Sequence, residues 1–193
     1  MVLVHGMGRT PASMLPLGRW LGRHGFATQV WGYWSYRRTV PELADAFAER
    51  LDAIAGTAET VHFVTHSLGG ILVRAALDRR PVANVGRAVM LTPPSQGSHA
   101  ADRWAPYLGR LMPPIRDLRT TDDALVRLLP TPVGLEVGVI AGARDGKVSV
   151  AESVLVGQRD HVVLPCRHSL IMHRRDVREL TLRFLRTGSF AAG

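Results

Sequence analysis

The segment from residue 61 to residue 70 constrains the fold of this chain more than any other. Residues 61–66 are mostly apolar and rich in β-branched side chains, which is typical of a buried strand. A helical pattern starts directly after Ser67, with small or apolar residues at the spacing of one helix face: Leu68, Ile71, Leu72, Ala75 and Ala76. A strand that passes straight into a helix through one serine indicates an α/β unit.

Ser67 itself allows two interpretations. In the first, the strand, serine and helix form a nucleophile elbow, a sharp turn that exposes the serine hydroxyl. This turn requires small residues two positions before and two positions after the serine. Gly69 satisfies the requirement, whereas Thr65 stands where glycine is usual. In the second interpretation, Ser67 is the N-cap of an ordinary helix, a position that serine favours.

Strand and helix patterns alternate along the rest of the chain. We expect further strands at residues 1–4, 26–31, 87–91, 133–141 and 161–164. We expect further helices at residues 14–21, 41–54, 125–129 and 177–185. Ser13 is a suitable N-cap for the first of these helices, and either Thr121 or Asp122 for the third. The alternation predicts one compact α/β domain over residues 1–193, with a mainly parallel sheet flanked by helices on both faces and no large cap.

The composition is that of an ordinary globular protein. Hydrophobic residues make up 46% of the chain and charged residues 21%, and no apolar run approaches the roughly 18 residues of a transmembrane segment. No signal peptide is visible, so a cytoplasmic location is expected unless further residues precede Met1. The only cysteine, Cys166, excludes an intramolecular disulfide and is more typical of a small buried residue than of a nucleophile.

The net charge of +8 comes mainly from arginine, since Lys147 is the only lysine. Such a charge can attract anionic membranes or nucleic acid. However, the arginines are scattered over helix faces, with one modest cluster at Arg174, Arg175 and Arg178, and no nucleic-acid-binding module is recognisable. An arginine-rich solvated surface is the favoured interpretation, with no nucleic acid as partner. The oligomeric state is not indicated.

Reactive or polar residues follow four of the expected strands: His5, Ser67, Asp145 and His168. The carboxyl ends of parallel strands meet at one edge of a sheet, where α/β proteins form their sites. A serine hydroxyl is a weak nucleophile, so it needs a base, and that base needs an acid to orient it. The order Ser67, Asp145, His168 matches the nucleophile, acid and base order associated with nucleophile elbows.

An acyl-transfer site also needs donors for the developing oxyanion. The N–H of Leu68, directly after Ser67 at the start of a helix, is one candidate. The N–H of Met7, in the turn of residues 5–7, is the second. The predicted catalytic residues are therefore Ser67, Asp145 and His168, with an oxyanion hole formed by Met7 and Leu68.

Four short motifs resemble those of the α/β-hydrolase superfamily, in particular the small bacterial lipases and esterases without a large lid. Residues 2–8 resemble the oxyanion turn of that group and residues 65–70 its elbow. Residues 145–148 resemble its acid loop and residues 168–169 its histidine loop. The resemblance implies hydrolysis of carboxylic esters or lipids through a serine acyl-enzyme, with no cofactor and no metal.

Several alternatives remain open at this stage. The same triad also serves thioesterases, peptidases and amidases, and a non-catalytic binding module can retain the fold. Asp160 and His161 precede the last strand and are alternative supports for the histidine loop. His66 belongs to the elbow pattern, and its side chain is expected to point away from the base. Ser95 and Ser98 lie in a loop that can line the substrate site.

Residues 92–132 are the part of the chain that remains to cover the strand ends. This segment is rich in proline and predicts a single short helix, so we expect an open site without a lid. The opposing possibility is an apolar flap that opens at lipid surfaces, formed by Trp104, Tyr107, Leu108, Leu111, Met112 and Ile115.

Overall fold

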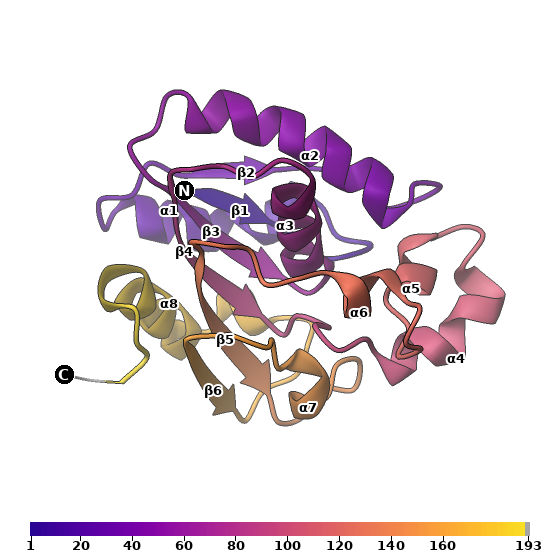
Figure 1. The fold of residues 1–193 in the computed structure, drawn as a ribbon. Helices are drawn as coiled ribbons and strands as arrows, with labels where there is room; N and C mark the ends of the chain where they lie inside the picture. Colours follow the sequence, from indigo (N-terminus) through magenta and orange to yellow (C-terminus); the bar gives the residue numbers. More distant parts are fainter. Residues whose placement is uncertain (192–193) are drawn as a thin grey trace.

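The structure, a computed structural model, describes residues 1–191 and contains one six-stranded parallel sheet (Figure 1). The strands are β1 (Val2–Val4), β2 (Gln29–Trp31), β3 (Val61–His66), β4 (Val85–Leu91), β5 (Glu136–Gly142) and β6 (Asp160–Leu164). Their order in the sheet is β2-β1-β3-β4-β5-β6, and every neighbouring pair is parallel. The prediction of a mainly parallel sheet is confirmed.

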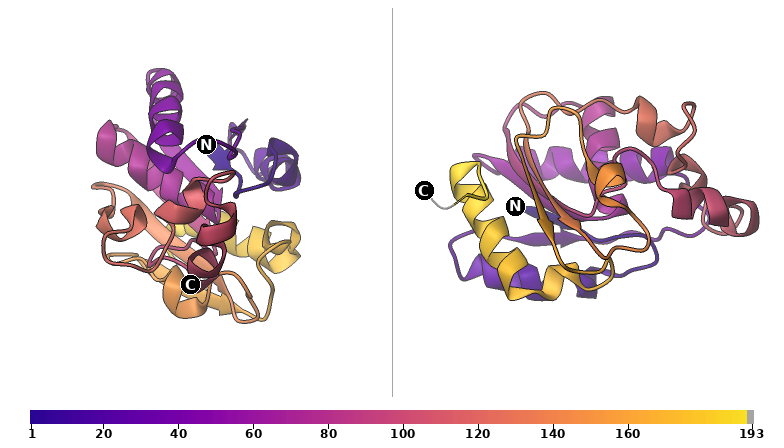
Figure 2. Two further views of the ribbon diagram at one scale, coloured as in Figure 1. Left: turned by 90° about the vertical axis from the view of Figure 1, so that its right-hand side faces the viewer. Right: turned by 90° about the horizontal axis from the view of Figure 1, so that it is seen from below.

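Helices cover both faces of the sheet, as the two views of Figure 2 make plain. The helices are α1 (Leu15–Gly22), α2 (Val40–Ala55), α3 (Leu68–Arg79), α4 (His99–Leu108), α5 (Pro114–Asp117), α6 (Leu125–Leu128), α7 (Val150–Ser153) and α8 (Arg175–Thr187). Two 3₁₀ helices, η1 (Pro11–Ser13) and η2 (Ile171–His173), complete the set. In the left view, α2 and α3 lie on one side of the sheet and α1 and α8 on the other.

Each face of the sheet has its own hydrophobic core. Successive strand residues point to opposite faces, so Val2 and Val4 pack toward α2 and α3, whereas Leu3 packs toward α1 and α8. The central strands β3, β4 and β5 contribute to both cores in the same way. Strands buried on both faces read as continuous apolar runs, and this is why their sequences show little alternation.

The strand order reverses between β1 and β3. From β1 the chain adds β2 on one side, then returns to place β3 on the other side and continues outward to β6. The carboxyl ends of β1 and β3 are neighbours in register, with Val4 opposite Thr65. In open α/β sheets, sites form at such a reversal, so the loops after β1 and β3 are brought together there.

Three expectations about the helices, two on N-caps and one on their number, need correction. Ser13 does not cap α1: it lies inside η1, and the N-cap is Met14, because Pro11 starts a helical turn earlier. Neither Thr121 nor Asp122 caps α6, whose N-cap is Ala124 without a side-chain hydrogen bond. The segment 92–132 carries three short helices rather than one.

Helix α4 is the largest element that the sequence pattern did not reveal. Ser98 caps it, accepting a hydrogen bond from the N–H of Ala101 at 3.3 Å, and Pro106 lies inside it. Its aromatic residues Trp104 and Tyr107 are exposed rather than buried against the sheet. The residues that α4 buries are the small Ala101 and Ala105, so no large apolar side chain marks it as a core helix.

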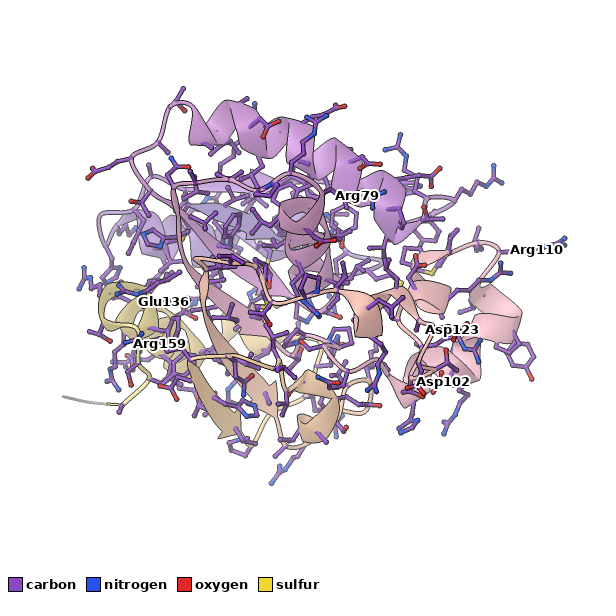
Figure 3. All side chains as sticks on the ribbon, in the orientation of Figure 1. Arg79, Asp102, Arg110, Asp123, Glu136 and Arg159 are labelled. Carbon is purple, nitrogen blue, oxygen red and sulfur yellow. The ribbon has the colours of Figure 1, made fainter. Side chains whose placement is uncertain are left out.

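Ion pairs neutralise part of the arginine-rich surface. Glu136 pairs with Arg87 at 2.7 Å and with Arg159 at 2.9 Å, near the start of β5, and Figure 3 labels Glu136 and Arg159 side by side. Arg79 of α3 pairs with Asp45 of α2 at 2.6 Å. Exposed pairs of this kind add little stability. Within residues 1–191, no helix is long and apolar enough to cross a membrane.

Replacing Phe184 with alanine tests the core between the sheet and α8. Phe184 is completely buried and packs against Phe190 in a tilted arrangement, with 4.9 Å between the ring centroids. It also lies over Gly138, where an added Cβ would come within 2.6 Å of its ring. We expect Phe184→Ala to lower the free energy of unfolding by about 3–5 kcal/mol in denaturant titration. Leu128→Ala, at a 68% exposed side chain, is the control and should change it by less than about 0.5 kcal/mol. Equal losses in the two variants would contradict this account of the core.

Candidate active site

Ser67 occupies a strained backbone conformation between β3 and α3. Its φ of 52° and ψ of −123° lie outside the regions that L-residues ordinarily adopt. The N–H of Ser67 donates to the carbonyl of Leu91 at 2.9 Å, which fixes the turn against the end of β4. Its side chain makes no capping hydrogen bond to α3. The simple N-cap interpretation is therefore wrong, and the backbone has the form expected of an elbow.

Two glycines allow this turn to form. A Cβ on Gly69 would lie 2.5 Å from the carbonyl oxygen of Val4 and 2.8 Å from that of His5, so α3 starts in direct contact with the end of β1. A Cβ on Gly6 would lie 2.6 Å from the His66 ring and 3.2 Å from the Cβ of Ser67. Only glycine fits at either position, and the turn after β1 is thereby held against Ser67.

The departure from the usual elbow pattern at Thr65 also has a structural explanation. Thr65 is completely buried, and a Cβ on Gly70 would lie 3.1 Å from its hydroxyl oxygen. Gly70 thus leaves the space that the larger side chain at residue 65 occupies. The small residue at this contact is therefore Gly70, and residue 65 itself can be larger.

Asp145 and His168 are in direct contact. The Nδ1 atom of His168 lies 2.7 Å from Oδ2 of Asp145, whose side chain is completely buried. The other carboxylate oxygen of Asp145 accepts hydrogen bonds from the N–H groups of Lys147 at 2.8 Å and Val148 at 3.0 Å. Because the carboxylate only accepts, Nδ1 carries the hydrogen and Nε2 of His168 is left as a proton acceptor.

Thr92 is a further contact of the histidine that sequence reasoning missed. Its hydroxyl oxygen lies 3.2 Å from Nδ1 of His168, and its N–H donates to the carbonyl of Ile140 at 2.9 Å. Its φ of 44° is unfavourable for a β-branched residue. The only sequence signal was the abrupt loss of periodicity at residues 92–94, directly after β4.

His66 was expected to point away from the base, and that expectation is wrong. Its ring centroid lies 4.9 Å from that of His168, and its Nε2 lies 3.0 Å from the carbonyl oxygen of His168. A carbonyl accepts only, so Nε2 of His66 carries a hydrogen and donates it. Complete burial holds the pKa of His66 well below its usual value, and the nearby His168 lowers it further. His66 therefore stays neutral and fastens the histidine loop to the end of β3.

The neutral state of His66 makes stability depend on pH. The unfolded chain gains a proton at His66 below about pH 6.5, whereas the folded chain does not, so the unfolding free energy must fall as the pH falls through that range. We expect His66→Gln, which keeps an N–H donor, to reduce this fall by up to about 1.4 kcal/mol per pH unit. The measurement is denaturant titration between pH 7 and pH 5, with the exposed His173→Gln as control. An unchanged pH dependence in His66→Gln would contradict the assignment.

The predicted oxyanion donors belong to the two turns that meet at Ser67, since an added Cβ on Gly6 would lie 3.2 Å from the Cβ of Ser67. Leu68 is the first residue of α3, and the first N–H groups of a helix have no partner within it. His5 holds the turn that contains Met7: it is completely buried, its Nδ1 contacts the carbonyl of Gly6 at 2.9 Å, and its ring stacks on Tyr33. Burial lowers the pKa of His5, so it remains neutral and serves as a support for the turn.

Ser67 and His168 line the same pocket, which has a volume of about 660 Å³. Met7 lies in its wall, and the remaining wall is mostly apolar: Ala101, Trp104, Leu108, Met112, Ile115 and Leu118. Four of the six residues of the apolar flap that we considered thus line the pocket, whereas Tyr107 and Leu111 are exposed outside it. Ser98 lines the pocket and Ser95 does not.

Two other candidates, Asp160 and Cys166, take no part in this arrangement. The carboxylate of Asp160 accepts hydrogen bonds from Ser189 and Phe190, near the far end of β6, so it does not support the histidine loop. Cys166 is buried, and burial raises the pKa of its thiol. Within the described part of the chain, no group of three or more His, Cys, Asp or Glu side chains is arranged to hold a metal ion.

Several solved structures with a similar fold are lipases and esterases. The mature form of a lipase from Bacillus licheniformis superposes with a TM-score of 0.68 at 18% identity, over 84% of this chain and 82% of the lipase. A carboxylesterase from Bacillus subtilis superposes with a TM-score of 0.63 at 16% identity, over 97% of this chain and 83% of the esterase. No protein-family model matches the sequence, and no curated protein matches it significantly.

A phospholipase from Legionella pneumophila has a similar fold within a longer chain. It superposes with a TM-score of 0.79 at 18% identity over 98% of this chain, which spans 60% of the phospholipase. Identities this low establish the fold alone. The protein has the α/β-hydrolase fold, as the four sequence motifs predicted.

Proposed function

We propose that this protein is a serine hydrolase that cleaves carboxylic esters through an acyl-enzyme on Ser67. The observation that carries the proposal is the 2.7 Å hydrogen bond between Asp145 and His168 beside the pocket that Ser67 also lines. A serine on a strained turn, a histidine with a free Nε2 and a buried carboxylate are the three parts that nucleophilic acyl transfer requires. The lipases and esterases with this fold support the same reaction class.

In the first half of the reaction, His168 removes the proton from the Ser67 hydroxyl as its oxygen attacks the ester carbonyl carbon. The N–H groups of Met7 and Leu68 donate to the oxygen on which negative charge develops. Asp145 stabilises the positive charge on the imidazolium of His168. The carbon–oxygen ester bond then breaks, and His168 gives its proton to the departing alcohol oxygen, which leaves an acyl group on Ser67.

In the second half, water takes the place of the alcohol. His168 removes a proton from the water molecule as it attacks the acyl carbonyl carbon, and the same two N–H groups stabilise the oxyanion. The bond to Ser67 breaks, its oxygen regains a proton from His168, and the carboxylic acid leaves. The contact between His66 and His168 keeps the histidine loop in place through both halves.

A panel of 4-nitrophenyl esters of increasing acyl length, with a thioester and an anilide of one matched acyl group, tests this function. We expect the esters to be hydrolysed faster than the anilide, because a nitrophenolate leaves more readily than an amine. Ser67→Ala, assayed with the same panel, controls for spontaneous hydrolysis. Cleavage of the thioester or anilide without ester hydrolysis would instead support the thioesterase or amidase alternative.

We also expect simple saturation kinetics without a jump in rate at a lipid surface. The pocket is bordered by α4, α5 and their connections, and no long amphipathic helix within residues 1–191 covers it. Ester hydrolysis should therefore need no lid opening. The measurement is the rate of tributyrin hydrolysis across its solubility limit. A sharp rise above that limit would show that Trp104, Leu108 and their neighbours form a flap.

A further inference from the structure

A second cavity, of about 930 Å³, adjoins the pocket of Ser67. It is formed mainly by the loop after β5 and by the loop that carries His168. The two cavities share three lining residues: Gly146, Lys147 and His168. The catalytic histidine of the proposed mechanism therefore stands at the boundary between them.

The wall of the second cavity combines basic residues with apolar ones, among them Leu170 and Ile171. Arg144, Lys147, Arg167 and Arg174 contribute to its wall, and no aspartate or glutamate does. Arg174 is paired with Asp176 at 2.6 Å. The other three basic residues are exposed and take part in none of the ion pairs formed within residues 1–191. Three like charges thus face one cavity without a protein counter-charge.

Some arginines elsewhere are paired with carboxylates, as Arg79, Arg87 and Arg159 are, and others, such as Arg19 and Arg23, are exposed without an ion pair. What sets Arg144, Lys147 and Arg167 apart is that three such cations line one cavity. Like charges held close together repel one another, so the cluster costs stability unless an anion occupies the space between them. Guanidinium groups present forked donors that match phosphate and carboxylate oxygens. The cavity is therefore chemically suited to an anion.

The position of the second cavity indicates which part of an ester substrate would lie next to it. The apolar pocket contains Ser67 and the Met7 turn, and so suits the acyl group that becomes attached to the serine. His168 must deliver the proton that it took from Ser67 to the oxygen of the departing alcohol. The alcohol portion consequently lies on the side of His168, where the cationic cavity begins.

We propose that the preferred substrates are esters whose alcohol portion carries an anionic group such as a phosphate, bound in the cavity formed by Arg144, Lys147 and Arg167. This proposal rests on the ester-hydrolase function above and adds the class of leaving group to it. The acyl chain occupies the apolar pocket, the ester carbonyl lies at Ser67, and the anion lies beyond His168. The protein thereby selects amphiphilic esters with a negatively charged polar end.

The test compares two monomeric substrates with the same acyl chains, dihexanoylglycerophosphate and the neutral dihexanoylglycerol, both below their aggregation limits. We expect kcat/KM for the phosphate ester to be about tenfold higher or more, since charge-assisted bonds to arginine are among the stronger hydrogen bonds. Raising the ionic strength from about 0.01 M to about 1 M, which shortens the Debye length from ~30 Å to ~3 Å, should remove most of the preference. Equal kcat/KM values at low salt would overturn the proposal.

The double variant Arg144→Gln/Arg167→Gln should lower the ratio of the two kcat/KM values about fivefold or more. The matched control is Arg19→Gln/Arg23→Gln, which removes the same charge from exposed positions on and beside α1 and should leave the ratio unchanged. A ratio that persists in the first variant, or that falls equally in both, would overturn the role of the cavity.

A result against the proposed function is distinguishable from a result against this inference. If neither ester is hydrolysed, the proposed function fails, and binding of dihexanoylglycerophosphate to the wild-type protein at low salt then decides the inference. Binding that is lost in Arg144→Gln/Arg167→Gln and kept in the control supports the anion site. Absence of binding, or equal binding in all three proteins, contradicts it.

Discussion

Replacing Ser67 with alanine should lower kcat/KM for ester hydrolysis by at least about 10³-fold while the fold persists. The hydroxyl is the atom that forms the acyl-enzyme in the proposed mechanism. Thr92 also has a positive φ and a hydroxyl beside His168, but that hydroxyl contacts Nδ1, the atom that faces Asp145, rather than Nε2. The measurement is steady-state hydrolysis of a 4-nitrophenyl ester, with circular dichroism to check the fold. A variant that keeps a tenth of the wild-type rate would show that Ser67 is not the nucleophile.

Stability provides an independent view of the same residue. Ser67 has a φ of 52°, in the region that glycine tolerates and other residues avoid, at a cost of about 1–3 kcal/mol. Ser67→Gly should therefore be inactive and yet at least as stable as Ser67→Ala. A glycine variant that is clearly less stable than the alanine variant would contradict the description of a strained elbow.

Replacing His168 with alanine should lower kcat/KM by about 10³-fold, because both proton transfers of the mechanism pass through its Nε2 atom. Asp145→Ala should cost about 10²-fold or more, since the carboxylate orients the ring and stabilises its positive charge without transferring a proton itself. Both losses should appear mainly in kcat. The 2.7 Å contact between the two side chains predicts that the double variant loses little more than His168→Ala alone.

Asp160→Ala is the matched control for Asp145→Ala. Both aspartates accept backbone hydrogen bonds, Asp145 in the loop after β5 and Asp160 at the start of β6. However, Asp160 contacts Ser189 and Phe190 instead of His168. We expect Asp160→Ala to lower the free energy of unfolding and to change kcat/KM by less than about twofold from the wild-type value, because Asp160 touches no reacting group. An Asp160→Ala variant that folds and loses as much activity as Asp145→Ala would mean that the acid has been assigned to the wrong residue.

The order of elements was predictable from the sequence because buried parallel strands and amphipathic helices leave strong local patterns. The strand that leads into Ser67 and the terminal helix that ends before Gly188 have nearly the expected bounds. The predicted N-cap at Ser13 was wrong, and helix α4 was not predicted. The first depends on a competing turn started by Pro11. The second is a helix whose Trp104 lines a pocket and whose Tyr107 is exposed, so neither aromatic residue joins the core.

The residues of the candidate site were predictable to the extent that they follow strands in sequence. Ser67, Asp145 and His168 do, and their grouping follows from the geometry of a parallel sheet. Thr92 and His66 reach His168 through contacts between segments 76 and 102 residues apart, which no local pattern encodes. The cationic cavity is likewise formed by loops that meet only in the folded chain.

Covalent labelling with a fluorophosphonate, followed by mass spectrometry of the digested protein, tests the central claim most directly. The reagent reacts with a serine that a neighbouring base has activated, so it reports the nucleophile without requiring the natural substrate. The account predicts a single phosphonylated peptide that contains Ser67, no labelling in Ser67→Ala, and slow labelling in His168→Ala. Labelling at another serine, or ester hydrolysis by a protein whose Ser67 remains unlabelled, would contradict it.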